Sequence, residues 1–498
     1  MSYLLALDAG TTSNRAILFD GRGQVLSQAQ REFSQYFPQP GWVEQDPVQI
    51  YSTMLGVAVE AISQSGIQKK DIQAIGITNQ RETTILWDKK TGQPVHRAIV
   101  WQCRRTTDRA EALRAAGLTD LIQKKTGLVI DAYFSATKIA YILDQVPGLR
   151  DRAKRGEIAF GTVDSYLIYR LTGGRTHATD VSNACRTMLY NIHTEDWDQE
   201  ILDILDIPRE ILPQVYPSSH FFGHSQAELL GREIPITGVL GDQQAALFGQ
   251  ACFEPGEAKN TYGTGAFVLM NTGHNPIPSS QGLLTSIAWK MGQETTYALE
   301  GSIFVAGSLI QWLRDQLGLM EKASQSEAMA RSVEDTHGLM VVPAFTGLGA
   351  PYWNSKARGS IVGLSRGANK NHLVRASLEA IALLSYDVIK TMELDSGLDR
   401  KVLKVDGGAA QNNFLMETQA NILNAPVIRP RSIESTARGA AFMAGIGSGY
   451  YRGLEEIKDL WQEDRVFRPQ MDPDLRHRLI QDWHHAVKNC LAWTQREE

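Results

Sequence analysis

Residues 4–20 read LLALDAGTTSNRAILFD, in which two apolar runs flank a short polar turn. The runs Leu4–Leu7 and Arg15–Phe19 have the length and composition of buried strands, and the turn between them can join antiparallel neighbours. After a second turn that contains two glycines, Val25–Phe33 is expected to add a third antiparallel strand. The chain therefore opens with a predicted three-stranded meander, onto which the rest of the fold is built.

The turn of this hairpin has the chemistry of a phosphate-binding loop. Gly10 lets the backbone approach a ligand closely, and Arg15 adds a fixed positive charge. Asp8, at the mouth of the turn, can hold Mg²⁺ through its water ligands. The hydroxyl and N–H groups that would meet phosphate oxygens belong to Thr11, Thr12 and Ser13. The alternative is an ordinary polar hairpin turn, because no Gly-Lys-Ser/Thr follows to make a Walker A loop.

Length and composition narrow the class of protein. A chain of 498 residues exceeds what one hydrophobic core usually serves, so two large domains are expected. The net charge of −5 gives no reason to expect nucleic acid or an anionic membrane as a partner. The four cysteines form no Cys-x-x-Cys pair, which predicts reduced thiols rather than a zinc site or disulfides. No apolar run approaches the roughly 20 residues that span a bilayer, so a soluble cytoplasmic protein with a small-molecule partner is expected.

Four helices are expected in the regions that bear on the later argument. Apolar spacing predicts a helix over Val48–Ser65, with Pro47 at its start and Asp46 as its cap. A charged helical stretch is expected over 106–126, and a short helix over Ile201–Leu212, stopped by Pro213. A further helix is expected over Ile303–Leu317.

Polar side chains follow several predicted buried strands, which is where α/β proteins place their sites. Arg81 and Glu82 come shortly after Ile72–Thr78, and a solvated surface ion pair is the alternative for these two residues. Asp242 follows Ile236–Leu240, in the first turn of a predicted helix. Because Asp is a preferred helix cap, plain capping is the alternative role for Asp242.

The second half of the chain repeats the pattern of the first. A turn of glycine and hydroxyl residues at 260–265 precedes the strand-like run Ala266–Met270, and two further runs complete another meander. Lys401–Val405 then leads into a glycine pair at a strand-to-helix turn, where a nucleotide base or phosphate can lie against the backbone. The repeated pattern predicts an ancestral duplication, with one domain over 1–252 and a second over 253–498.

Four turns suited to phosphate or base now stand in order along the chain: Asp8–Arg15, Gly241–Gln244, Tyr262–Gly265 and Asp406–Asn412. This order resembles the superfamily of sugar kinases, hexokinase, Hsp70 and actin. The resemblance implies an α/β fold of two ribonuclease-H-like domains with an interdomain cleft for ATP and Mg²⁺. Tyr133–Gln145 and Gly359–Glu379 resemble the two signatures of the FGGY carbohydrate kinases, with Lys138 in place in the first. Tyr141 is a departure, since Trp is common there, but an aromatic side chain is kept.

The resemblance covers essentially the full chain, and segments such as Gly41–Pro47 and Ile77–Thr84 are similar to members of the family that act on glycerol. It implies a glycerol site whose hydroxyl-binding side chains are Arg81, Glu82, Tyr133, Asp242 and Gln243, with Trp101 and Phe267 against the carbon side. It further implies that Mg²⁺ lies near Asp8 and Asp242, and that the ATP phosphates meet Thr11, Thr12, Ser13 and Arg15. The second domain would hold the nucleotide through Thr264, Gly307, Gln311, Gly408 and Asn412.

The reaction implied by the resemblance is ATP-dependent transfer of a phosphoryl group to a terminal hydroxyl of glycerol, with Asp242 as the general base. One rival is a kinase of the same family that acts on a pentulose or another polyol. Another is a non-catalytic actin-like or chaperone-like ATPase, which would have no use for the polyol-suited residues. No appended helix-turn-helix segment or basic stripe points to nucleic acid. The family also implies a homodimer or homotetramer.

Overall fold

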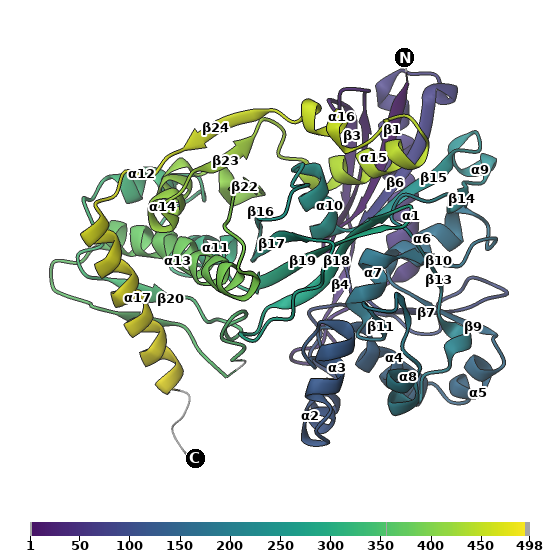
Figure 1. Ribbon diagram of the computed structural model, residues 1–498, viewed down its shortest axis with the longest axis horizontal. Coiled ribbons are helices and arrows are strands. Elements are labelled where there is room, and N and C mark those ends of the chain that lie inside the picture. Colours follow the sequence, from purple (N-terminus) through teal and green to yellow (C-terminus); the bar gives the residue numbers. More distant parts are fainter. Residues whose placement is uncertain (1, 355, 494–498) are drawn as a thin grey trace.

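The fold is built on a six-stranded sheet that contains the opening meander, as seen in a computed structural model that describes residues 2–354 and 356–493 (Figure 1). The strand order is β14-β15-β6-β1-β2-β3. β1 pairs antiparallel with β2 and parallel with β6, and β15 extends the parallel part. The bounds are β1 (Tyr3–Ala9), β2 (Ser13–Phe19), β3 (Val25–Glu32), β6 (Ile72–Asn79), β14 (Gly223–His224) and β15 (Pro235–Gly241). The predicted meander is confirmed.

Helices cover both faces of this sheet because side chains along β1 alternate between two cores. Leu5 and Leu7 pack with the apolar side of α1 (Pro47–Ser65), whereas Leu4 and Ala6 pack with the helix α15 (Ser435–Gly447). The start of α1 is as predicted, since the Asp46 carboxylate accepts hydrogen bonds from the first-turn N–H groups and Pro47 begins the helix.

A seven-stranded sheet organises the second half, with the order β18-β19-β17-β16-β22-β23-β24. β16 and β17 form an antiparallel hairpin, and β22 pairs parallel with β16 as β6 does with β1. The two halves therefore share a topology, as the duplication predicts. The bounds are β16 (Glu257–Tyr262), β17 (Ala266–Gly273), β18 (Leu284–Met291), β19 (Glu294–Ile303), β22 (Val402–Asp406), β23 (Val427–Pro430) and β24 (Glu463–Phe467).

Five helices accompany this second sheet: α11 (Gly307–Asp315), α12 (Gln325–Arg331), α13 (Lys370–Ser396), α14 (Asn413–Leu423) and α17 (Pro473–Trp493). The predicted helix over Ile303–Leu317 is wrong at its start, because β19 continues to Ile303 and α11 begins only at Gly307. In α17, His484 contacts the buried carboxylate of Asp387 on α13, with 3.0 Å between Nε2 and Oδ1.

Helix α15 lies between β23 and β24 of the second sheet in sequence but packs on the first sheet (Figure 1). Glycines allow backbone to meet backbone there: a Cβ added to Gly76 of β6 would lie 2.1 Å from the carbonyl oxygen of Ala440. The same holds for Gly439, where a Cβ would lie 1.9 Å from the carbonyl oxygen of Ala245 on α10 (Asp242–Gly249). The predicted boundary between 252 and 253 falls between α10 and β16 and stays a prediction.

The first half also contains a set of shorter helices. The charged stretch 106–126 folds as two helices rather than one, and the helix predicted over Ile201–Leu212 ends at Leu205. Asp206 takes a left-handed conformation (φ 48°) there, and Pro208 follows, so the helix cannot continue. The bounds are α2 (Thr107–Ala115), α3 (Thr119–Thr126), α4 (Ser135–Gln145), α5 (Leu149–Lys154), α6 (Val163–Leu171), α7 (Val181–Ala184), α8 (Gln199–Leu205) and α9 (Ala227–Leu230).

Besides four single-turn 3₁₀ helices, the remaining elements of the described residues are short strands and one α-helix: β4 (Gln35–Tyr36), β5 (Glu44–Gln45), β7 (Ile85–Asp88), β8 (Ala98–Ile99), β9 (Ile158–Gly161), β10 (Ala178–Asp180), β11 (Tyr190–Asn191), β12 (Asp196–Trp197), β13 (Gln214–Tyr216), β20 (Met340–Val342), β21 (Ser360–Val362) and α16 (Leu454–Leu460). Among the described residues, no helix has both the length and the apolar character needed to cross a membrane.

Candidate active site

A cavity of about 230 Å³ lies where the opening hairpin meets the start of α10. Three parts of the chain far apart in sequence line it, because β1, β15 and α15 converge at this edge of the sheet. The lining residues are Asp8, Gly10, Thr11, Thr12, Ser13, Arg15, Gln30, Asp242, Gln243 and Thr436. The structure thus brings the predicted phosphate loop together with Asp8 and Asp242, the two carboxylates predicted to bind metal. Asp242 is also the predicted base.

The phosphate loop is tightly closed. The N–H of Gly10 donates to the carbonyl of Ser13 at 3.0 Å, and a Cβ at Gly10 would lie only 2.9 Å from that oxygen. Arg15 donates to Asp8 Oδ2 at 2.6 Å and to Glu434 Oε2 at 2.7 Å. These carboxylates, Asp8 above all, raise the pKa of Arg15 above its usual range. Arg15 is therefore a permanent cation that ties the loop to the segment leading into α15.

Asp242 is the first residue of α10, directly after β15. The helix cap position belongs to Gly241, so the alternative of plain capping by Asp242 is wrong. The Asp242 side chain is 30% exposed and lies 3.1 Å from Arg81 Nε. Burial raises the pKa of the Asp242 carboxyl, while the positive charge of Arg81 opposes that rise. The result is a carboxylate that faces the cavity and is held from behind by a cation.

Arg81 and Glu82 are buried, so the alternative of a solvated surface ion pair is wrong. Arg81 forms two hydrogen bonds with the Glu300 carboxylate, at 2.6 and 2.8 Å. Glu82, which holds a left-handed backbone conformation (φ 59°), accepts a 2.7 Å hydrogen bond from Arg186 Nε. Arg186 also lies 3.3 Å from Glu300. Two cations and two carboxylates therefore make a closed network beneath Asp242.

Three predicted aromatic residues gather beside this network. Trp101 meets Tyr133 edge-on with 5.6 Å between ring centroids, and meets Phe267 edge-on at 6.3 Å. The indole N–H of Trp101 donates to Thr11 Oγ1 at 3.0 Å, which links the aromatic group to the phosphate loop. Together these rings give an apolar wall next to carboxylates, the combination that suits a small polyol.

The five residues predicted to hold the nucleotide from the second half lie outside the lining of the cavity. Gly307 begins α11, and its N–H donates to the carbonyl of Gly263, beside Thr264. Gln311 lies one turn further along α11, and Gly408 follows the glycine turn after β22. Asn412 caps α14, and its amide nitrogen donates to Ser326 Oγ at 3.2 Å. Their nucleotide-binding role stays a prediction.

The prediction missed several charged residues of the site. Glu300 lies in the buried strand β19, and Arg186 follows the short helix α7; both are completely buried. Lys259, in the middle of β16, is also completely buried. For Glu300 the available signal was a single charge inside the largely apolar end of a strand-like run, because such a charge is rarely buried without a partner. The partners of Glu300 and Arg186 come from segments about 100 or more residues away.

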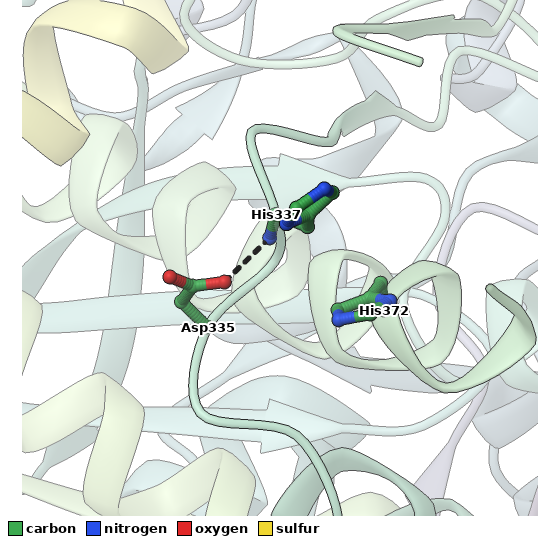
Figure 2. Close-up of side chains that lie close together, drawn as sticks. All are labelled: Asp335, His337 and His372. Atoms are coloured by element: carbon green, nitrogen blue, oxygen red, sulfur yellow. Dashed lines mark hydrogen bonds between the residues drawn. The ribbon is translucent and has the colours of Figure 1, made fainter. Parts of the chain in front are cut away.

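One group of metal-suited side chains, Asp335, His337 and His372, lies near the start of α13 in the second half (Figure 2). Asp335 Oδ1 accepts a 2.7 Å hydrogen bond from the backbone N–H of His337. His372 Nδ1 accepts the N–H of Asn369 and completes the cap of α13. These contacts account for Asp335 and His372 as turn and cap residues.

Fold and site together define a class: a phosphotransferase with two lobes of related topology and a phosphate-suited cavity at the edge of the first sheet. Comparison with known sequence families agrees. The N-terminal domain of the FGGY family of carbohydrate kinases matches residues 3–249, and its C-terminal domain matches residues 258–448. The chain belongs to the FGGY family of carbohydrate kinases.

Relatives named glycerol kinase are similar over the whole chain. Glycerol kinase 2 of Thermotoga maritima is 56% identical over 496 residues, which cover 100% of both chains. A glycerol kinase of Agathobacter rectalis is 57% identical over 493 residues, 99% of each chain. Among solved structures, Plasmodium falciparum glycerol kinase with ADP has a TM-score of 0.92 at 36% identity, covering 99% of this chain and 98% of that one. A xylulose kinase from Lactobacillus acidophilus, at 23% identity and TM-score 0.89, shares the fold.

Proposed function

We propose that this kinase transfers the γ-phosphoryl group of ATP to a terminal hydroxyl of glycerol, giving sn-glycerol 3-phosphate and ADP. The observation that carries the proposal is the single cavity lined by both the hydroxyl-rich loop and Asp242. Relatives named glycerol kinase that are 54–57% identical over nearly the full chain support the choice of acceptor.

Glycerol is held by side chains that match its three hydroxyl groups and its carbon edge. The hydroxyl-binding set is Arg81, Glu82, Tyr133, Asp242 and Gln243, and Trp101 and Phe267 cover the C–H side. Arg81 and Glu82 can hold fixed positions because Glu300 and Arg186 bind them from behind. A neutral triol needs both donors and acceptors around it, and this set supplies both.

The phosphates of ATP bind at Thr11, Thr12, Ser13 and Arg15, and the second lobe holds the rest of the nucleotide through Thr264, Gly307, Gln311, Gly408 and Asn412. Mg²⁺ fits the site because it prefers oxygen ligands, and the carboxylates of Asp8 and Asp242 line the same cavity. When bound, Mg²⁺ would neutralise part of the negative charge on the phosphates. Arg15 adds a second positive charge at the loop.

Asp242 acts as the general base. Its carboxylate faces the cavity and accepts the proton of the glycerol hydroxyl as that oxygen attacks phosphorus. The raised pKa of Asp242 favours proton acceptance, while Arg81, 3.1 Å away, fixes the orientation of the carboxylate. Phosphoryl transfer depends mainly on positioning and charge, so closure of the lobes around both substrates excludes water that would otherwise hydrolyse ATP.

The proposal includes the setting in which the enzyme works. We place it in the cytoplasm, where ATP is available, as a homodimer or homotetramer. The formal net charge of −5 gives no electrostatic reason for a nucleic-acid partner.

An ATP-consumption assay against a panel of acceptors tests the proposal. Purified protein with Mg²⁺ and ATP is offered glycerol, dihydroxyacetone, erythritol, xylulose or gluconate, and ADP formation is followed in a coupled assay. Glycerol is expected to give the highest kcat/KM, with sn-glycerol 3-phosphate as the product. Preference for a pentulose would overturn the acceptor assignment. ADP release that no acceptor stimulates would instead indicate an ATPase.

A further inference from the structure

Lys259 is a completely buried lysine beside the acceptor-binding residues. It lies on β16 of the second half, yet its Nζ contacts the Oε1 of Gln243 on α10 of the first half. The same nitrogen donates to Thr261 Oγ1 at 2.9 Å and to the carbonyl of Phe267 at 3.2 Å. These three contacts match the three N–H donors of an ammonium group, so the lysine is held in one position.

The contact with Lys259 decides which end of the Gln243 amide faces the cavity. An ammonium group only donates hydrogen bonds, so the amide oxygen of Gln243 must point toward Lys259. Gln243 is 7% exposed and lines the cavity, which leaves its NH₂ end for a ligand there. Asp242, one residue earlier, offers a carboxylate to the same cavity. A donor and an acceptor therefore stand side by side.

The charges around Lys259 support its ammonium form at neutral pH. Burial has the largest effect on the pKa of Lys259 and, with the Arg81 guanidinium, opposes the charge, whereas Asp406 at the end of β22, Asp242 on α10 and Glu300 on β19 favour it. The balance lowers the pKa of Lys259 to about 8. Lys404, next to it on β22, donates to the carbonyls of Gln250 and Ala251 instead.

We propose that Lys259 is a positioning residue for the phosphoryl acceptor: it fixes the amide of Gln243 so that its NH₂ group donates to one hydroxyl of the polyol, while Asp242 accepts from the hydroxyl that is phosphorylated. This inference rests on the proposed function. It gives the acceptor pocket one donor and one acceptor for two hydroxyl groups of the polyol. It also means that β16 of the second lobe helps to set the specificity of a site on the first lobe.

A double-mutant cycle tests the proposal by measuring KM for glycerol and for ATP in the variants Lys259→Met, Gln243→Ala and the double variant. Each single change is expected to raise KM for glycerol about tenfold, the effect of one hydrogen bond, and to change KM for ATP less than twofold. The double variant is expected to resemble Gln243→Ala alone, because Lys259 acts through Gln243. Independent, multiplying effects would overturn the proposal, as would an equal effect on both substrates.

Lys404→Met is the matched control, since it also removes a buried lysine from the same sheet. It is expected to lower thermal stability while leaving KM for glycerol unchanged. If Lys259→Met does not fold, Gln243→Glu decides the question, because its carboxylate keeps the pair with Lys259 but presents an acceptor to the cavity. A KM for glycerol that rises at least tenfold supports the proposal, and an unchanged KM overturns it.

The wild-type protein separates this inference from the proposed function. Failure of wild-type protein to phosphorylate glycerol rejects the proposed function, and the cycle is then measured with the best acceptor of the panel. Coupling between Lys259 and Gln243 on that acceptor would still support a positioning role.

Discussion

The orientation of the Asp242 carboxylate depends on the charged residues behind it. Its carboxylate is partly exposed toward the cavity, yet Arg81 lies 3.1 Å from it and is itself bound by the buried Glu300. Asp242→Asn keeps the shape but removes the proton acceptor. We expect kcat to fall by about 10²-fold or more while ATP still binds, measured by a coupled assay and by nucleotide titration. Turnover near that of the wild type would remove Asp242 from the role of base.

The buried carboxyl of Asp164 is expected to make the stability of the fold depend on pH. It is completely buried and accepts hydrogen bonds from Thr162 and Thr179 at 2.5 and 2.6 Å. Burial raises the pKa of Asp164 from 3.8 to about 7. Between pH 3.8 and about 7, the folded state therefore binds up to one more proton than the unfolded state. The stabilisation that protonated Asp164 gives to the folded state is complete below pH 3.8 and is lost as the pH rises to about 7.

Asp164→Asn removes this proton. In the wild type, the titration of Asp164 lowers the unfolding free energy by up to about 1.4 kcal/mol per pH unit across that window. We expect the variant to lack this pH dependence. Denaturant titrations between pH 4 and 8 measure the slope in both proteins. Parallel curves for wild type and variant would contradict the assignment of the titration to Asp164.

At the residue scale, sequence reasoning found Asp242 and the hydroxyl loop, which line the cavity, and Arg81 behind Asp242, but not the buried residues that pair with Arg81 and Glu82. Arg81, Asp242 and the hydroxyl loop could be predicted because each follows a buried strand. Arg186 and Glu300 could not, because their value comes from ion pairs with Glu82 and Arg81 that only folding creates. Pairing over such distances leaves no spacing pattern in the sequence.

At the scale of elements, the packing of α15 on the first sheet depends on the absence of side chains. Gly76→Ala would place a Cβ 2.1 Å from the carbonyl oxygen of Ala440, so strand or helix must move. We expect a loss of about 1–3 kcal/mol in unfolding free energy, as for other overpacked cores. Gly453→Ala is the control, because a Cβ there meets nothing within 4 Å. Equal stability of the two variants in thermal or denaturant unfolding would argue against the close contact.

Helix boundaries show what local pattern leaves undetermined. The cap and proline of α1 fix its start from the sequence. The end of α8 at Leu205 could not be predicted by apolar spacing, which continues to Leu212, because the left-handed turn at Asp206 breaks the helix first. Likewise the start of α11 was placed too early, since β19 uses Ile303 to pair with Ala266 of β17. Strand pairing therefore decides the start of α11, and a local backbone turn decides the end of α8.

For the whole molecule, the duplicated topology was predictable because strand patterns recur. The packing of α15, a helix from the second half of the chain, on the first sheet was not predictable. Several contacts join the lobes, among them α15 on the first sheet, the Arg81–Glu300 ion pair and the contact of Lys259 with Gln243. We therefore expect one cooperative transition in scanning calorimetry, with equal calorimetric and van't Hoff enthalpies. Two resolved transitions, with the first half melting alone, would contradict this coupling.

The late position of α15 also has a consequence for protein synthesis. The apolar face of β1 and β6 that it covers leaves the ribosome early, yet Ser435–Gly447 is translated only after both meanders are complete. Until then the nascent chain carries an open hydrophobic surface, which chaperones must shield if it is not to aggregate. A premature stop codon shortly before residue 435 would therefore damage the lobe that was made first.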